Sequence, residues 1–254
     1  MQQRLDYVWR SVISVRQSLW RKSLARLTGE SPLSRTCQIP NLRETYARLG
    51  LSPHSGTFVE IGAFDGEGHS NTSFLADQGW RGIYVEPVLE RCTAVKLRHM
   101  LNNVTVEPVA ASDTAGECEI RVMGALSTMD GETAGAYKAI RWGKKKASRA
   151  TTRTIRTERL DTILTRNAVR NDVELMVIDV EGHELPIVEA LMASPWRPKV
   201  LIVELVDNHP DFDAFSTLKG NALKARKLIV ANGYQPVYTD QVNTIFAEKP
   251  RPPG

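Results

Sequence analysis

The sequence predicts an α/β fold with a mostly parallel sheet that is covered by helices on both faces. Short apolar runs, several of which end in an acidic residue, alternate with segments of helical periodicity. The runs are spaced far enough apart for crossover helices, which parallel strands require. Two closely spaced runs near the C-terminus indicate a hairpin that adds an antiparallel strand.

The first predicted strand covers residues 57–61 and ends in a glycine-bearing turn. Further strands are predicted at 82–86, 104–106, 119–123, 175–179 and 200–204, with the hairpin at 234–238 and 244–248. Helices are predicted at 73–79, 89–101, 184–192 and 222–232. In sheets of this kind, ligands bind beyond the carboxyl ends of the strands, so polar residues at those ends are candidates for a site.

Composition is typical of one main globular domain. The chain has 254 residues, of which 42% are hydrophobic and 24% charged, so it can bury a full core. Its net charge of +4 gives no reason to expect a nucleic-acid partner. The three cysteines are far apart and predict neither a disulfide framework nor a zinc site, which favours a cytoplasmic location.

The N-terminal segment predicts a basic amphipathic helix outside the main domain. Apolar residues recur at close to helical spacing between residues 5 and 27, and arginines and lysines are interspersed. Glycine and prolines in residues 29–40 indicate a linker, so we divide the chain into an extension at 1–40 and a main domain at 41–254. The helix is expected to pack on the domain, to pack on a second copy in a homo-oligomer, or to lie on an anionic membrane at its inner face.

The turn after the first strand favours a particular kind of nucleotide ligand. Gly62 and Gly66 allow a sharp backbone turn, and Glu86 at the end of the second strand can accept both hydroxyl hydrogens of a ribose. The G-x-G-x-x-G spacing of dinucleotide-binding turns is absent, and Asp65 would repel a pyrophosphate. The turn therefore suits a cationic nucleoside without phosphates, such as S-adenosylmethionine, better than it suits NAD.

Five segments in order resemble the FkbM family of methyltransferases. They are Val59–Gly66, Gly82–Pro87, Ala110–Asp113, Arg159–Leu164 and Ile178–Glu184, and the similarity runs from about residue 55 to 248. The resemblance implies a class I methyltransferase (Rossmann-like) fold, with a seven-stranded sheet whose last strand is reversed. It also implies O-methylation with S-adenosylmethionine, often of a sugar hydroxyl in a glycan, a lipopolysaccharide or a glycosylated natural product.

The same resemblance implies which residues bind the cofactor. Glu60, Gly62 and Asp65, together with the neighbouring Gly66, would surround the methionine portion. Glu86 would bind the ribose. Ser112 and Asp113 would lie near the adenine, and Asp179 is a further candidate contact.

His183 is the predicted catalytic base, because it follows the strand that ends at Asp179 and an imidazole accepts protons near neutral pH. The alternative is that His183 caps the following helix. Asp179 and Glu181 flank it, and Asp179 would orient the histidine, contact the cofactor or, with Glu204, ligate a divalent metal such as Mg²⁺ or Mn²⁺. The sequence does not decide between these roles, so no metal ligand is assigned.

A basic segment precedes the fourth resembling block and is predicted to form a lid or loop at about 124–156. Eight cations lie in or just after it: Arg141, Lys144, Lys145, Lys146, Arg149, Arg153, Arg156 and Arg159. The segment would recognise an anionic sugar or glycan acceptor, or it is simply a solvated loop. Tyr137 and Trp142 could stack on a sugar or a base. The alternative functions are methylation of RNA or a small natural product, and a non-catalytic module that binds S-adenosylmethionine.

Overall fold

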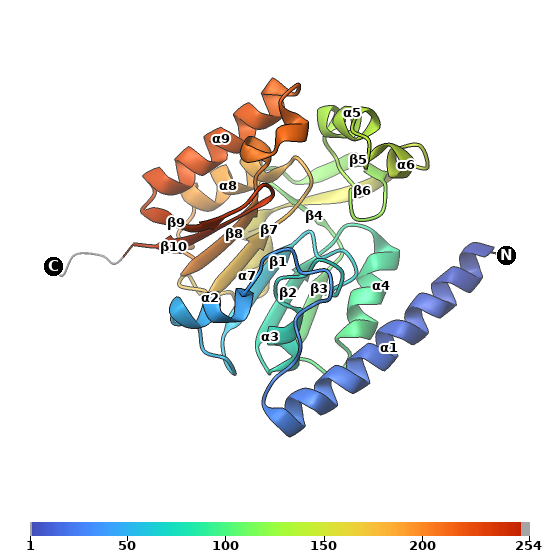
Figure 1. Ribbon diagram of the computed structural model, residues 1–254, viewed down its shortest axis with the longest axis vertical. Coiled ribbons are helices and arrows are strands. Elements are labelled where there is room, and N and C mark those ends of the chain that lie inside the picture. Colours follow the sequence, from blue (N-terminus) through green and yellow to red (C-terminus); the bar gives the residue numbers. More distant parts are fainter. Residues whose placement is uncertain (1, 250–254) are drawn as a thin grey trace. The chain divides into compact units, whose positions relative to one another are not determined.

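The computed structural model describes the backbone of residues 2–249 and the side chains of residues 12–249. Within them, the main sheet has seven strands in the order β3-β2-β1-β7-β8-β10-β9, and a second sheet has three in the order β4-β6-β5 (Figure 1). The chain forms two compact units, residues 1–108 and 109–254. The predicted boundary at residue 40 falls inside unit 1.

Unit 1 contains three parallel strands connected by helices. β1 (Thr57–Ile61) pairs with β2 (Arg81–Val85), which pairs with β3 (Val104–Glu107). The helices are α1 (Gln2–Thr28), α2 (Leu42–Arg48), α3 (Ser73–Asp77) and α4 (Leu89–Arg98). Nearly all residues of β1 and β2 are buried, as expected for parallel strands that are covered on both faces.

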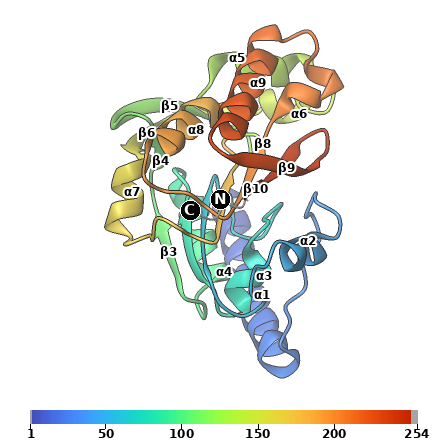
Figure 2. The ribbon, with the colours of Figure 1, turned by 90° about the vertical axis from the view of Figure 1, so that its left-hand side faces the viewer.

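Unit 2 contains the remaining strands of the main sheet. β7 (Leu175–Ile178) runs parallel to β8 (Val200–Glu204), whereas β10 (Asn243–Glu248) is antiparallel to both β8 and β9 (Tyr234–Thr239). α8 (Glu184–Ala193) and α9 (Ser216–Ala231) lie side by side on this part of the sheet (Figure 2). α7 (Leu160–Arg166) precedes β7.

The strand order confirms the predicted fold class. Along the chain, β1, β2, β3, β7 and β8 are the first five strands of the main sheet, and their order is the Rossmann order 3-2-1-4-5. The reversed last strand completes a seven-stranded, mostly parallel sheet. The helical N-terminal segment is also present as α1, although the side chains of Leu5, Val8 and Trp9 lie outside the described residues. No helix in the described part of the chain is long and apolar enough to cross a bilayer.

The basic segment is ordered, so the prediction of a loop at 124–156 was wrong. It forms α5 (Gly131–Ala139), α6 (Lys144–Ala147) and most of β6 (Thr151–Arg159). β6 is rich in threonine, which favours strands, and it lies between β4 (Ala110–Ser112) and β5 (Gly116–Val122). Asp130 caps α5 by accepting a hydrogen bond from the Thr133 amide.

Candidate active site

The turn after β1 has the conformation that its glycines allow. Gly62 has φ +90° and Gly66 has φ +73°, and both lie in the left-handed region. The Gly62 amide donates a hydrogen bond to the Val85 carbonyl at 2.9 Å, which holds the turn against the end of β2. A Cβ on Gly66 would lie 3.1 Å from the His99 ring. Glycine at position 66 therefore lets the turn pack closely against His99.

Two predicted cofactor residues fix the shape of this turn. The Glu60 carboxylate accepts hydrogen bonds from the hydroxyls of Ser70 (3.1 Å) and Thr72. Asp65 Oδ1 accepts hydrogen bonds from the amides of Glu67 (3.0 Å) and Gly68 (2.7 Å). Both side chains thus have a structural role, and their contact with the methionine portion stays a prediction.

Glu86 is a buried carboxylate at the end of β2, with 2% of its surface exposed. Its Oε2 accepts a hydrogen bond from the Phe64 amide (3.0 Å), and its Oε1 accepts one from the Val88 amide (2.9 Å). Arg91 approaches the same carboxylate at 3.5 Å. Burial nevertheless dominates and raises the pKa of Glu86 to about 7.

A buried ion network lies behind the turn, and no local sequence pattern predicts it. Arg98 is fully buried and forms ion pairs with Asp77 (2.7 Å) and Glu67 (2.8 Å). Glu67 also pairs with Arg21 of α1. Because Glu67 lies between Gly66 and Gly68, this network connects α1 and α4 to the turn after β1.

His99 also supports the turn after β1, through a hydrogen bond to Gly66. Its Nδ1 faces the side-chain amide of Asn102 at 2.9 Å and accepts its hydrogen bond, so Nε2 carries the proton that is donated to the Gly66 carbonyl at 2.9 Å. Burial, together with the positive charge of Arg98, lowers the pKa of His99 to about 3. The imidazole is therefore neutral and holds a fixed tautomer.

In unit 2, three acidic residues at strand ends form a group that we call the acid cluster. Asp179 follows β7, Glu181 lies two residues further, and Glu204 ends β8. One carboxylate oxygen from each lies within 4.8 Å of the other two. Burial and the neighbouring negative charges raise the pKa of Glu181 and of Glu204 well above its usual range. Such a cluster can hold a proton or a divalent cation.

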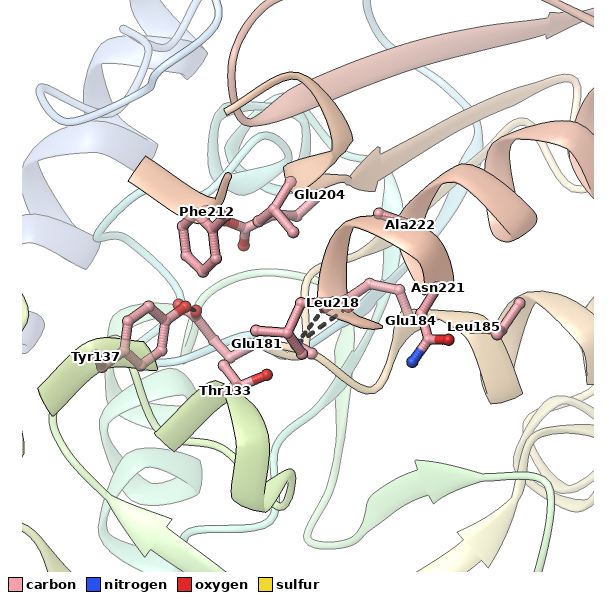
Figure 3. A pocket seen from close by; sticks show the side chains of 12 residues that line it. Thr133, Tyr137, Glu181, Glu184, Leu185, Glu204, Phe212, Leu218, Asn221 and Ala222 are labelled. Atoms are coloured by element: carbon pink, nitrogen blue, oxygen red, sulfur yellow. Dashed lines mark hydrogen bonds between the residues drawn. The ribbon is translucent and has the colours of Figure 1, made fainter. Parts of the chain in front are cut away.

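The loop that carries Glu181 is tightly held. Glu184 accepts hydrogen bonds from the amides of Val180 and Gly182, at 3.0 to 3.1 Å, and the bonds to Gly182 are visible in Figure 3. Gly182 has φ +101°, and a Cβ there would lie 2.0 Å from Thr133 Oγ1 on α5. Glu184 thus holds the loop in place, and only glycine fits at position 182.

A cavity of about 30 Å³ adjoins the acid cluster, which is room for about one water molecule. Tyr137 of α5, Phe212, Glu181 and Glu204 are among the residues that line it (Figure 3). The Tyr137 hydroxyl donates a hydrogen bond to the Glu181 carboxylate. The sequence suggested Tyr137 only as a stacking residue, because its pairing with Glu181 joins positions 44 residues apart.

His183 belongs to a different group of side chains. Its Nε2 lies 3.0 Å from Ser112 Oγ, and Ser112 Oγ lies 3.0 Å from Asp113 Oδ1. Three predicted site residues are therefore together, and burial lowers the pKa of His183. His183 occupies the N-cap position of α8, but its side chain makes no capping hydrogen bond, so the capping alternative is wrong.

The fold is that of a class I methyltransferase. The family model for the methyltransferase FkbM domain matches residues 60–236, which is more than half of the chain. The chain therefore belongs to the FkbM methyltransferase family. A comparison with curated protein sequences found no match.

Two solved structures with a similar fold carry the name methyltransferase. An O-methyltransferase from Bacillus cereus in complex with SAH is 13% identical, with a TM-score of 0.47 and coverage of 92% of this chain and 90% of that chain. A precorrin-6y C5,15-methyltransferase from Geobacter metallireducens is 14% identical, with a TM-score of 0.42 and coverage of 87% and 95%. At these TM-scores the likeness does not extend to substrate or mechanism.

Proposed function

We propose that the protein is an S-adenosylmethionine-dependent O-methyltransferase that acts on a sugar hydroxyl of a glycan, a lipopolysaccharide or a glycosylated natural product. The observation that carries this proposal is the acid cluster beside Tyr137 in a small cavity of unit 2. The cavity has room for one hydroxyl-sized group, and carboxylates accept hydrogen bonds from hydroxyl groups.

The residues of unit 1 fit the proposed cofactor. Glu86 accepts two amide hydrogen bonds and faces Arg91 at 3.5 Å, and because each carboxylate oxygen can accept two hydrogen bonds, Glu86 retains capacity to accept from ribose. Glu60 and Asp65 place negative charge at the turn, which favours a cationic ligand. When bound, S-adenosylmethionine supplies an electrophilic methyl group on a sulfonium.

The chain must position the acceptor and remove its proton. Methyl transfer forms a carbon–oxygen bond, breaks the carbon–sulfur bond and releases the hydroxyl proton. A carboxylate with a raised pKa, such as Glu181, is a competent acceptor for that proton, and Tyr137 orients it through their hydrogen bond. His183, at 3.0 Å from Ser112, is the second candidate base, and Ser112 and Asp113 remain our proposed adenine contacts.

The basic segment supports an anionic acceptor. All eight of its cations are exposed, and they project from α6, β6 and the turns on either side of α6. Exposed cations of this density attract phosphorylated or acidic glycans, and they would also attract RNA. RNA methylation is therefore the second candidate function.

Two measurements test the proposal. Calorimetry should show binding of S-adenosylmethionine and not of NAD, and binding of NAD alone would contradict the cofactor assignment. Incubation with methyl-labelled cofactor and panels of glycans, lipopolysaccharide precursors and RNA should label a carbohydrate. The turnover of His183→Ala and Glu181→Gln, each measured with and without EDTA, distinguishes the candidate bases. Loss of turnover in His183→Ala identifies the histidine as the base. Loss in Glu181→Gln identifies the carboxylate, and sensitivity of the wild type to EDTA would show that the carboxylate acts by binding a cation.

A further inference from the structure

The helix α1 buries its small and polar residues. Its buried positions are Ser14, Ser18, Arg21 and Ala25, which are spaced three or four residues apart and form one stripe. This stripe faces the rest of unit 1, where α1 lies along α4 (Figure 1). Sequence reasoning would place the apolar side of an amphipathic helix in such a position.

Polar contacts hold this inward face. The Arg21 guanidinium donates hydrogen bonds to the Pro32 carbonyl (2.5 Å) and to Glu67. Lys22 Nζ donates a hydrogen bond to the Asp77 carbonyl at 3.1 Å. The orientation of α1 is therefore set by directional bonds and an ion pair, and turning the helix over would leave Glu67 without Arg21.

The apolar residues of α1 face outward instead. Leu19 is 50% exposed, Trp20 57% and Leu27 85%, and Val12 and Ile13 are nearly half exposed. At 3.6 residues per turn, these five positions fall within an arc of about 120° that is opposite the buried stripe. Arg16 and Arg26 are exposed within or beside the same arc. The outward face is thus apolar and cationic.

The positive charge of α1 indicates what kind of surface covers its outward face. Residues 7–29 contain no acidic residue, and the exposed cations on or beside the outward face are Arg16 and Arg26. A second copy of α1 would bring like charges together, whereas an anionic lipid surface would neutralise them. A helix with tryptophan and leucine on one face and basic residues around it is suited to the bilayer interface. We propose that α1 docks the protein on an anionic lipid surface. The proposal is independent of methyl transfer.

Co-sedimentation with vesicles tests this docking on the full chain. The protein should pellet with vesicles of equal parts phosphatidylcholine and phosphatidylglycerol, and not with phosphatidylcholine alone. Added sodium chloride should weaken the binding. Leu19→Glu/Trp20→Glu should lower partitioning at least tenfold. Arg16→Glu/Arg26→Glu should also lower it at least tenfold, because each cation near such a surface contributes about fivefold.

Matched variants on α9 control for the added charges. Leu223 and Lys224 are exposed, so Leu223→Glu and Lys224→Glu should leave partitioning unchanged. Circular dichroism checks that every variant folds. Failure of the wild type to bind anionic vesicles, or unchanged binding of Leu19→Glu/Trp20→Glu, would overturn the proposal. A wild-type dimer that this double variant converts to a monomer would instead assign the face to a second copy.

Discussion

At the scale of single residues, Glu86 is subject to two opposing requirements. Burial raises its pKa to about 7, which favours the neutral carboxyl group. Binding two ribose hydroxyls requires the ionised form, because a protonated oxygen loses acceptor capacity. The proposed cofactor affinity should therefore depend on pH near neutrality.

We expect the dissociation constant for S-adenosylmethionine to fall as pH rises from 6 to 8, through the pKa of Glu86. Glu86→Gln should bind about 10- to 100-fold more weakly, because it loses a hydrogen bond to a charged group, and its affinity should no longer follow this pH dependence. Calorimetry at three pH values measures both effects. Glu117→Gln, an exposed position on β5, is the control, and a pH dependence retained in Glu86→Gln would contradict the assignment.

Tyr137 gives a second prediction at this scale. Tyr137→Phe removes the hydroxyl that orients Glu181 and should reduce turnover about 10- to 100-fold, with cofactor affinity unchanged. Steady-state kinetics and calorimetry measure the two quantities. Tyr238→Phe is a matched control, because its hydroxyl also donates to a carboxylate, that of Asp240 at 2.7 Å. Equal turnover in both variants would exclude the proposed role of Tyr137.

Some of these residues could be predicted from the sequence, and others could not. Glu86 and the acid cluster could be found because each follows an apolar run, and strand ends are where such folds bind ligands. Tyr137, Arg98 and His99 could not, because their roles depend on partners that are distant in the sequence. Local patterns do not report which side chains the fold brings together.

At the scale of elements, the loop that carries Glu181 depends on its fit against α5. Gly182→Ala should destabilise the protein by about 2–4 kcal/mol, because the backbone is left-handed and the new Cβ would overlap Thr133. Gly135→Ala, within α5 itself, meets no atom within 4 Å and should stabilise by about 0.5–1 kcal/mol. Urea unfolding of both variants should therefore give shifts of opposite sign, and similar shifts would refute this packing.

β6, the central strand of the second sheet, was the main element that sequence reasoning missed. β6 was assigned to a loop because its alternating threonines and arginines carry little apolar signal. Of its residues, Ile155 is the one buried apolar side chain before Leu160 begins α7. The strand forms because β5 pairs with it along seven residues. The formation of β6 thus depends on pairing with its neighbours, which hydrophobic periodicity does not report.

At the scale of the whole molecule, buried ionisable groups should make stability depend on pH in opposite directions. The folded pKa of His99 is lowered to about 3, so its contribution is complete above the unfolded pKa of about 6.5 and is lost as pH falls below it. Glu86 and Glu184 have folded pKa values of about 7, so their contributions are lost as pH rises from about 4.5 to 7.

His99→Gln should isolate the first of these effects. Between pH 7 and pH 5, the wild type should lose about 2 kcal/mol of unfolding free energy relative to this variant. Urea unfolding at both pH values provides the measurement. His54→Gln, at an exposed position, controls for the substitution itself. If the two variants showed the same pH dependence, His99 would not be the buried neutral group described above.

The Arg21–Glu67 pair has an evolutionary consequence. Glu67 lies inside the region that the family model matches, whereas Arg21 precedes that region by some forty residues. In a family member that lacks a helix equivalent to α1, a glutamate at position 67 would pair with the residue at position 98 alone. Selection should therefore keep glutamate at this position most strictly in lineages that also retain the helix, so that the two positions are inherited together.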